Sequence, residues 1–186
     1  MLPAPQHRTP YPTPAALLAK QELEEEFPDR CVCIIDSKGC GFGNGMLVLR
    51  AAELSRQGLS AREAGQILEE EVPHICQYFT VNDLNFLKRS GRVSGATAAI
   101  GTVLNIKPIL YGSADGHIVA CGKVRGRKKA IDTLVEIYAK KQVDAANHLV
   151  AISHGDCLAD AQAVTLHTQR SGNIDSLSVA QTARQS

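Results

Sequence analysis

The chain has 186 residues, of which 44% are hydrophobic and 21% are charged, and these proportions are ordinary for a soluble globular protein. A net charge of +1, 4% aromatic residues and no tryptophan argue against nucleic-acid binding, which uses positive fields and aromatic stacking surfaces. No segment approaches the ~18 apolar residues that cross a bilayer, and the N-terminus lacks a signal-peptide pattern. We therefore expect a cytoplasmic protein with no integral membrane contact.

The two ends of the chain differ in composition from its middle. Five prolines lie within the first 14 residues, so residues 1–14 are expected to form an extended, disordered head. Residues 163–186 are rich in serine, glutamine and threonine, which predicts a disordered tail. Ordered structure is expected between them, over about residues 15–162.

The first part of this ordered region predicts three helices and one strand. A helix over Ala15–Phe27 is followed by the apolar run CVCIID at Cys31–Asp36, which is typical of a buried parallel strand. A second helix is expected over Asn44–Gln57. A capping box formed by Ser60 and Glu63 marks the start of the third.

The second part predicts alternating strands and helices, with a hairpin turn at Asp115-Gly116. Such alternation is typical of an α/β fold with a mixed sheet. The expected strands are Gln77–Val81, Ile106–Tyr111, His117–Val124 and Leu149–Ser153. The expected helices are Leu84–Arg89, Ala96–Leu104, Lys128–Lys141 and one that starts near Asp156.

The first cluster that could carry chemistry is the glycine-rich loop DSKGCGFGNG at residues 36–45. Backbone N–H groups between a strand and a helix can bind an anion. However, the spacing of these glycines matches neither the dinucleotide-binding fingerprint nor the Walker pattern. Close helix packing, a capped turn, carboxylate binding and an interface with another domain all remain open.

The second cluster sets arginine beside small residues. Arg92 stands shortly before GATAAIG at residues 95–101, which carries almost no side-chain bulk. This pattern suits an amphiphile whose anionic head pairs with Arg92. Its apolar tail would lie along Gly95, Ala96 and Ala99. A tightly packed helix with a solvated cap is the alternative, because cations are favourable near a helix C-terminus.

The third cluster is the basic septet KVRGRKK at residues 123–129. Positive charge at a helix start opposes the helix dipole, so an anionic ligand or partner would explain the septet, as would RNA binding. The fourth is HGDC at residues 154–157, where Asp156 could cap a helix and no catalytic residue is predicted.

The six cysteines show no zinc-site spacing, so no metal site is predicted. No cofactor is predicted either. Cys31 and Cys33 alternate along the predicted strand and therefore face the same side. We expect reduced cysteines that act as small core residues.

Two stretches, FTVNDLNFLKRSGRVSGATAAIGTVLNIKPIL and DGHIVACGKVRGRKKAIDTLVE, resemble the DegV family of fatty-acid-binding proteins. The resemblance runs from about Ala16 to Asp160. It implies two α/β subdomains of the DegV type that enclose one fatty acid, with the acyl chain in a tunnel and the carboxylate near the inter-domain cleft. It further implies a non-enzymatic protein that presents a long-chain fatty acid for lipid metabolism. In bacteria that have a fatty acid kinase, the partner would be its ATP-binding subunit. Arg92 and Arg125 match arginines near the head group and the kinase docking surface.

The chain departs from the family at both ends. The family's opening part, its Ser/Gly carboxylate-binding motif and a late glycine-rich segment have no counterpart, and residues after about 162 fit no family pattern. We therefore expect a truncated copy. Residues 15–75 would be an incomplete N-terminal α/β domain, and residues 76–162 a partial C-terminal lipid-binding domain. A non-functional fragment, or a phosphate- or nucleic-acid-binding module, is the alternative.

Overall fold

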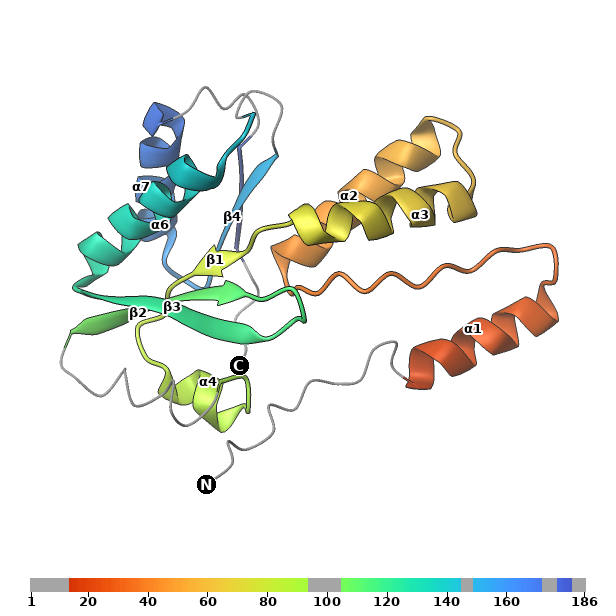
Figure 1. The fold of residues 1–186 in the computed structure, drawn as a ribbon, viewed down its shortest axis with the longest axis horizontal. Helices are drawn as coiled ribbons and strands as arrows, with labels where there is room; N and C mark the ends of the chain where they lie inside the picture. The colour runs from red at the N-terminus through yellow and green to blue at the C-terminus, as the bar shows by residue number, and fades with distance from the viewer. Residues whose placement is uncertain (1–13, 94–104, 145–148, 172–176, 182–186) are drawn as a thin grey trace. The chain divides into compact units, whose positions relative to one another are not determined.

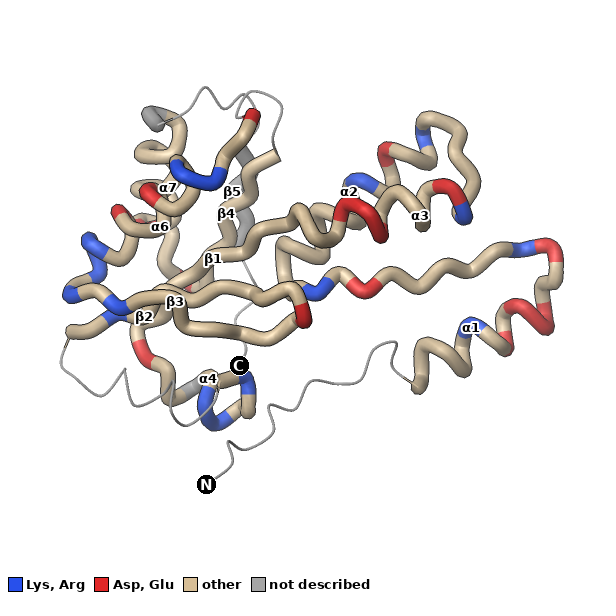
Figure 2. Tube along the Cα trace, viewed as in Figure 1, with Lys and Arg blue, Asp and Glu red and all other residues tan. Residues whose placement is uncertain are grey.

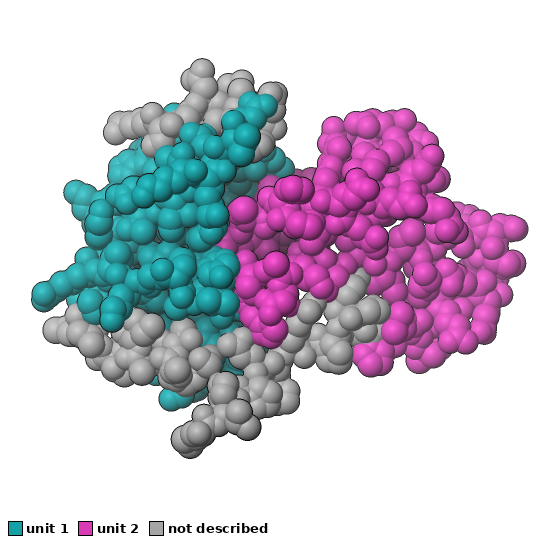
Figure 3. All heavy atoms as spheres, in the orientation of Figure 1, with its two compact units in different colours: residues 1–6, 78–111, 118–186 teal, residues 7–77, 112–117 magenta. Residues whose placement is uncertain are grey.

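The structure, a computed structural model, describes residues 14–93, 105–144, 149–171 and 177–181. The chain forms two compact units, coloured separately in Figure 3. The helical unit is made by the described residues up to Gln77 together with the loop Gly112–His117. The sheet unit is made by Tyr78–Tyr111 and the described residues from Ile118 onward. The division at Gln77 lies beside the boundary expected from the sequence at residues 75–76, and the expected roles of the two parts stay a prediction.

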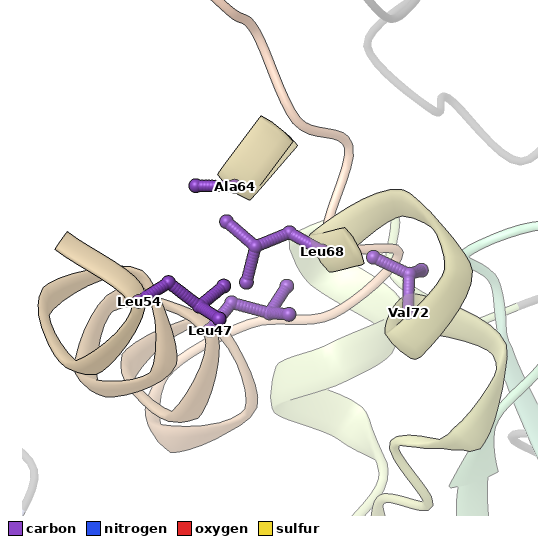
Figure 4. Packing of buried hydrophobic residues seen from close by; sticks show 5 residues of the cluster. All are labelled: Leu47, Leu54, Ala64, Leu68 and Val72. Carbon is purple, nitrogen blue, oxygen red and sulfur yellow. The ribbon is translucent and has the colours of Figure 1, made fainter. Parts of the chain in front are cut away.

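The helical unit is built around two packed helices. Its elements are α1 (Pro14–Glu26), α2 (Phe42–Arg56), α3 (Ala61–Glu71) and the short 3-10 helix η1 (Val72–His74) (Figure 1). Apolar residues spaced at the helical period on α3 meet apolar residues of α2, and together they exclude water. The buried cluster consists of Leu47, Leu54, Ala64, Leu68 and Val72 (Figure 4).

The start of α3 follows the sequence prediction closely. The Ser60 hydroxyl accepts a hydrogen bond from the Glu63 N–H, and the Glu63 carboxylate accepts one from the Ser60 N–H at 2.9 Å. This capping box satisfies two backbone donors that the first helical turn cannot satisfy. Arg50 of α2 also pairs with Glu71 of α3 at 2.9 Å, which ties the two helices together at their surface.

The segment that precedes α2 differs from the prediction. Residues 31–36 were expected to form a buried parallel strand, but the structure assigns no strand there, and Cys31 and Cys33 are exposed. A strand exists only where a neighbour completes its hydrogen bonds, and no described residue pairs with this segment. The predictions of a strand, and of buried core cysteines at these two positions, are therefore wrong. Helix α1 likewise has no buried residue, and Leu17 and Leu18 on it are exposed.

The sheet unit contains a three-stranded sheet in the order β1-β2-β3. Its strands are β1 (Tyr78–Phe79), β2 (Ile106–Gly112) and β3 (Ile118–Arg125). Strand β1 is antiparallel to β2, with Tyr78 opposite Tyr111 and their rings stacked 5.8 Å apart. The turn between β2 and β3 includes Gly116, in a left-handed conformation with φ 80°. The hairpin turn predicted at Asp115-Gly116 is confirmed.

Among the described residues, the sheet unit also contains three helices and two further strands. They are α4 (Asn85–Arg89), α6 (Arg127–Lys141), β4 (Val150–His154), α7 (Leu158–Ser171) and β5 (Leu177–Gln181). The predicted α/β fold is confirmed. Parallel and antiparallel pairing both occur, but in two separate sheets: β4 and β5 pair in parallel, and the three-stranded sheet contains antiparallel pairing.

The predicted disordered tail is wrong for much of its length, because α7 continues to Ser171 and β5 follows it. Helix α7 packs against α6, and its Thr168 is only 2% exposed. The composition of the part of α7 within that tail is that of a loop, but contact with β4 and α6 orders it as a helix.

Candidate functional site

Arg92 is held in place by the way in which α4 ends. The Asp83 carboxylate accepts the Asn85 N–H at 2.8 Å at the start of the helix. At its end the Gly91 N–H donates to the Lys88 carbonyl at 3.0 Å, and the Arg92 N–H donates to the Leu87 carbonyl at 2.8 Å. These two bonds form a Schellman motif, in which the residue at the Gly91 position must be left-handed. Gly91 has φ 71°, so a residue without a side chain sets the direction of the chain at Arg92.

The Arg92 side chain is exposed and only partly engaged. Its Nη1 donates to the Ser90 carbonyl, and no carboxylate among the described residues pairs with it. A guanidinium carries five N–H donors, so most of its hydrogen-bonding capacity is available to an anion. The next residue, Val93, is 5% exposed, and Leu84 on α4 is 1% exposed. A fixed positive charge therefore borders an apolar core.

Arg125 occupies the end of β3 and is also exposed. Within the basic septet, Arg127 pairs with Asp160 of α7 at 2.8 Å and Lys129 pairs with Glu136 at 3.1 Å. Arg125 has no acidic partner in the part of the chain that the structure describes. The carboxylates therefore explain two of the basic residues at the start of α6, Arg127 and Lys129, and leave Arg125 without an acidic partner among the described residues. Figure 2 shows Lys and Arg in blue where β3 passes into α6.

The two arginines lie next to opposite ends of one segment. Arg92 and Val93 precede residues 94–104, and Asn105 follows them. Gly126, next to Arg125, donates its N–H to the Asn105 carbonyl at 2.8 Å. The predicted small-residue wall, Gly95, Ala96 and Ala99, and the predicted helix Ala96–Leu104 lie in this segment, outside the described residues. The assignment of Arg92, Arg125 and this wall to one ligand site stays a prediction.

Asn105 is a residue of this region that the sequence analysis missed. It is one of three non-glycine residues with positive φ in the described chain, at 63°. Asparagine tolerates this conformation better than most residues, so an asparagine directly before a predicted strand was the available signal. Its carbonyl fixes Gly126 and thereby the path of the chain between Arg125 and α6.

The HGDC cluster forms the junction of β4 and α7. Asp156 is left-handed with φ 58°, and the Cys157 carbonyl accepts the Ala161 N–H at the first turn of α7. The Cys157 N–H donates to His154 Nδ1 at 3.3 Å. These hydrogen bonds form the turn at the start of α7, where we expected Asp156 to cap the helix. Cys157, and not Asp156, directly precedes the helix.

The glycine-rich loop is filled by a side chain. A Cβ at Gly39 would lie 1.9 Å from the Gln77 amide nitrogen, and one at Gly43 would lie 2.3 Å from Gln77 Cδ. The Cys40 N–H also donates to Gln77 Oε1 at 3.4 Å. The Gln77 side chain thus packs against the glycines and accepts one N–H of the loop, which supports the close-packing interpretation.

Two further features bear on the class of protein. Within the described residues, no group of three or more histidine, cysteine or acidic side chains is arranged to hold a metal ion. None of the helices in that part of the chain combines the length and hydropathy needed to cross a membrane.

The helical unit carries an apolar pocket of about 310 Å³ lined by Leu23, Phe27, Arg30 and Val32, which includes none of the predicted site residues.

Comparison with known sequences places most of the chain in one family. Residues 14–183 match the family described as "DegV: Uncharacterised protein, DegV family". The match continues beyond residue 162, so the expectation that the later residues fit no family pattern is wrong. A DegV domain-containing protein of Clostridium perfringens is 38% identical over 148 residues, which are 80% of this chain and 51% of that protein. YteA of Lactococcus lactis is 33% identical over 89% of this chain and 57% of its own length.

Solved structures give the same result. The fatty acid binding DegV family protein SAG1342 of Streptococcus agalactiae matches with a TM-score of 0.73 and 32% identity, over 88% of this chain and 57% of that chain. A structure described as fatty acid binding of a DegV family protein from Thermus thermophilus matches with a TM-score of 0.68 and 31% identity, over 90% and 59%. The chain thus spans little more than half the length of the relatives that it matches.

Proposed function

The chain belongs to the DegV family, and on this basis we propose that it binds one long-chain fatty acid and carries it for lipid metabolism without catalysing a reaction. The observation that carries the proposal is the likeness to two solved structures described as fatty-acid binding, each more than 30% identical to this chain. Most of the described residues take part in both matches.

A fatty acid has an apolar chain and an anionic head group, and the sheet unit contains both buried apolar residues and exposed arginines. Burying each methylene gains ~0.8 kcal/mol, so an acyl chain of about 15 methylenes gains on the order of 10 kcal/mol before losses. A carboxylate without a partner in a dry pocket would cost several kcal/mol of that gain. A charge-assisted bond from a guanidinium removes this penalty.

We assign the carboxylate to Arg92, with Arg125 as the second basic group. Arg92 is held by the α4 terminus, carries unused donors and borders the buried Val93. Arg125 lacks an acidic partner among the described residues and adjoins the far end of the same segment. The acyl chain would follow Gly95, Ala96 and Ala99, because small side chains leave room beside the backbone.

The proposal extends to a partner. A protein that carries an acyl chain and exposes its carboxylate suits presentation to the ATP-binding subunit of a fatty acid kinase, which would phosphorylate the carboxylate. Exposed basic residues around Arg125, such as Lys123 and Lys128, would favour docking to an acidic surface of that subunit. Neutralising these lysines should then slow association, most clearly at low salt.

The test uses delipidated protein and a fluorescent long-chain fatty acid. We expect a micromolar or tighter Kd for the intact chain. Arg92→Ala removes a charge-assisted bond worth ~1.5–3 kcal/mol, so Kd should rise by roughly 10–150-fold. Arg56→Ala, which changes an exposed arginine of α2, is the matched control and should leave Kd unchanged.

The methyl ester of the same fatty acid separates the head group from the tail. If Arg92 binds the carboxylate, the ester should bind more weakly to the native protein, and Arg92→Ala should weaken the ester no further. Equal losses for acid and ester would show that Arg92 does not bind the carboxylate. Absence of measurable binding by the native chain, together with no fatty acid in its organic extract, would favour the alternative of a non-functional fragment.

A further inference from the structure

The segment between α1 and α2 brings two thiols into contact. It runs between the helices without pairing to another described strand (Figure 1). Cys31 and Cys33 are separated by one residue, are both exposed, and have their Sγ atoms 3.7 Å apart. Neither residue belongs to the proposed lipid site, and the distance is close to van der Waals contact between two sulfur atoms.

We propose that Cys31 and Cys33 form a redox-active dithiol, which a peroxide converts reversibly into an intramolecular disulfide. The proposal depends on the contact between the sulfurs, their exposure and the unpaired backbone that carries them. It is independent of lipid binding, so either proposal can fail alone.

The positions of Cys31 and Cys33 allow a disulfide between them, but that disulfide would be strained. A disulfide requires an S–S distance of ~2.05 Å, so the sulfurs must approach by ~1.7 Å, which rotation of exposed side chains can supply in part. Alternate residues of an extended chain have Cα atoms ~6.6 Å apart. This spacing is near the upper end of the ~4.4–6.8 Å range that disulfides accept. Strained and exposed disulfides are the readily reduced ones, so the oxidised form should be reversible by thiols.

The absence of a paired strand also matters. In a sheet, drawing residues 31 and 33 together would break ladder hydrogen bonds on both sides. Here no described strand pairs with the segment, so the backbone can adjust without that loss. The main constraint lies at Cys33, since a Cβ at Gly65 of α3 would be 3.2 Å from its Cβ and Sγ.

The reaction proceeds in two steps that balance. The thiolate of one cysteine attacks a peroxide oxygen, which breaks the O–O bond, forms a sulfenic acid and, after protonation, releases water. The second thiolate then attacks the sulfenic sulfur, forms the S–S bond and displaces hydroxide, which is protonated to water. Two thiols lose two electrons and two protons, and the peroxide gains them.

The order of attack follows from the surroundings. Although Cys33 is exposed, its partial desolvation beside α3 and the hydrogen bond with Cys31 raise its pKa, whereas the nearby charges of Lys20 on α1 and Arg62 on α3 oppose this rise. Cys33 therefore keeps its proton to a higher pH than an ordinary thiol does. Cys33 also lies against α3, where a Cβ at Gly65 would be 3.2 Å from its Sγ, so a peroxide reaches it less easily. We therefore assign the first attack to Cys31 and the resolving step to Cys33.

The sequence makes the test unusually direct. Trypsin cleaves after Arg30 and Lys38 and so releases the peptide CVCIIDSK, which contains these two cysteines and no other. The full chain is treated with hydrogen peroxide, its remaining thiols are alkylated, and the digest is weighed by mass spectrometry. We expect this peptide to be unalkylated and lighter by two hydrogen atoms. Reduction before alkylation should return it to the doubly alkylated form.

Variants separate the pair from general oxidation. In Cys33→Ser, Cys31 has no resolving partner and should be trapped by dimedone as a sulfenic acid or proceed to a sulfinic acid. Cys40→Ser, which changes another exposed cysteine of the helical unit, should leave the disulfide yield unchanged. Circular dichroism checks that each variant is folded. The proposal is overturned if the native peptide stays fully alkylatable, carries sulfinic acids on both residues, or is cross-linked to another cysteine peptide.

Discussion

Two glycine-to-alanine substitutions in this chain should change stability in opposite directions, although neither new methyl group meets a neighbouring atom. A Cβ at Gly91 or at Gly45 would have nothing within 4 Å, so steric clash plays no part at either position. The positions differ in their backbone, because Gly91 has φ 71° at the end of α4 whereas Gly45 lies within α2. The experiment thus isolates backbone conformation from packing.

The expected magnitudes follow from that difference. A left-handed conformation costs an L-residue about 1–2 kcal/mol, and the reduced freedom of the unfolded chain returns about 0.4–1 kcal/mol of it. Gly91→Ala should therefore lower the free energy of unfolding by about 1 kcal/mol. Gly45→Ala should raise it by up to about 1 kcal/mol, because alanine is the better helix former. Gly91→Asn should fall between alanine and the native residue, since asparagine tolerates this conformation.

Urea unfolding followed by circular dichroism measures these changes. For a chain of this size 1 kcal/mol also shifts Tm by about 2–4 °C, which thermal unfolding resolves. Gly91→Ala should additionally weaken fatty-acid binding, because the Schellman motif that places Arg92 would be strained. Shifts of the same sign at both glycines would refute the reasoning, as would a Gly91→Ala protein as stable as the native one.

Further predictions concern the helical unit. Leu54→Ala should destabilise the protein by about 3–5 kcal/mol, because Leu54 is 2% exposed in the buried cluster. Leu49→Ala on the same helix, at a 53% exposed position, should cost far less. The midpoints of urea unfolding measure the stability of the two variants. The hydrogen bonds from Ser60 lower the pKa of Glu63, so the folded-state pKa is below the unfolded one. The associated stability is therefore present above the ordinary glutamate pKa and is lost as the pH falls through the lowered value. In Ser60→Ala the pKa of Glu63, followed by NMR titration, should return towards its ordinary value; an unchanged pKa would contradict the capping role.

The local features of the fold could be predicted from the sequence because they depend on neighbours along the chain. The capping box at Ser60 and Glu63 needs residues three apart, and the hairpin turn at Asp115-Gly116 needs a residue that accepts positive φ. Helices α2 and α6 follow from apolar spacing in the same way, within one or two residues of their predicted bounds. The DegV resemblance, which the comparisons confirm, also came from contiguous motifs.

Features that depend on distant partners could not be predicted in this way. The CVCIID run has the composition of a buried strand, yet a strand requires a hydrogen-bonded neighbour, and among the described residues this segment has none. Strand β5 shows the converse, because Leu177–Gln181 lies in a stretch of polar composition and is ordered by parallel pairing with β4. Both outcomes follow from the requirement that a strand's backbone groups be satisfied by another segment.

The same division applies to function. Residue order alone determined the family, the arginines expected to meet an anion and the spacing that puts Cys31 and Cys33 on one side. Only the tertiary structure decided that Asp160 neutralises Arg127 and leaves Arg125 without an acidic partner in the described chain, and that Gln77 fills the glycine loop. Charge and hydrogen-bond pairing depend on distances of a few ångströms between residues far apart in sequence, and folding alone sets those distances.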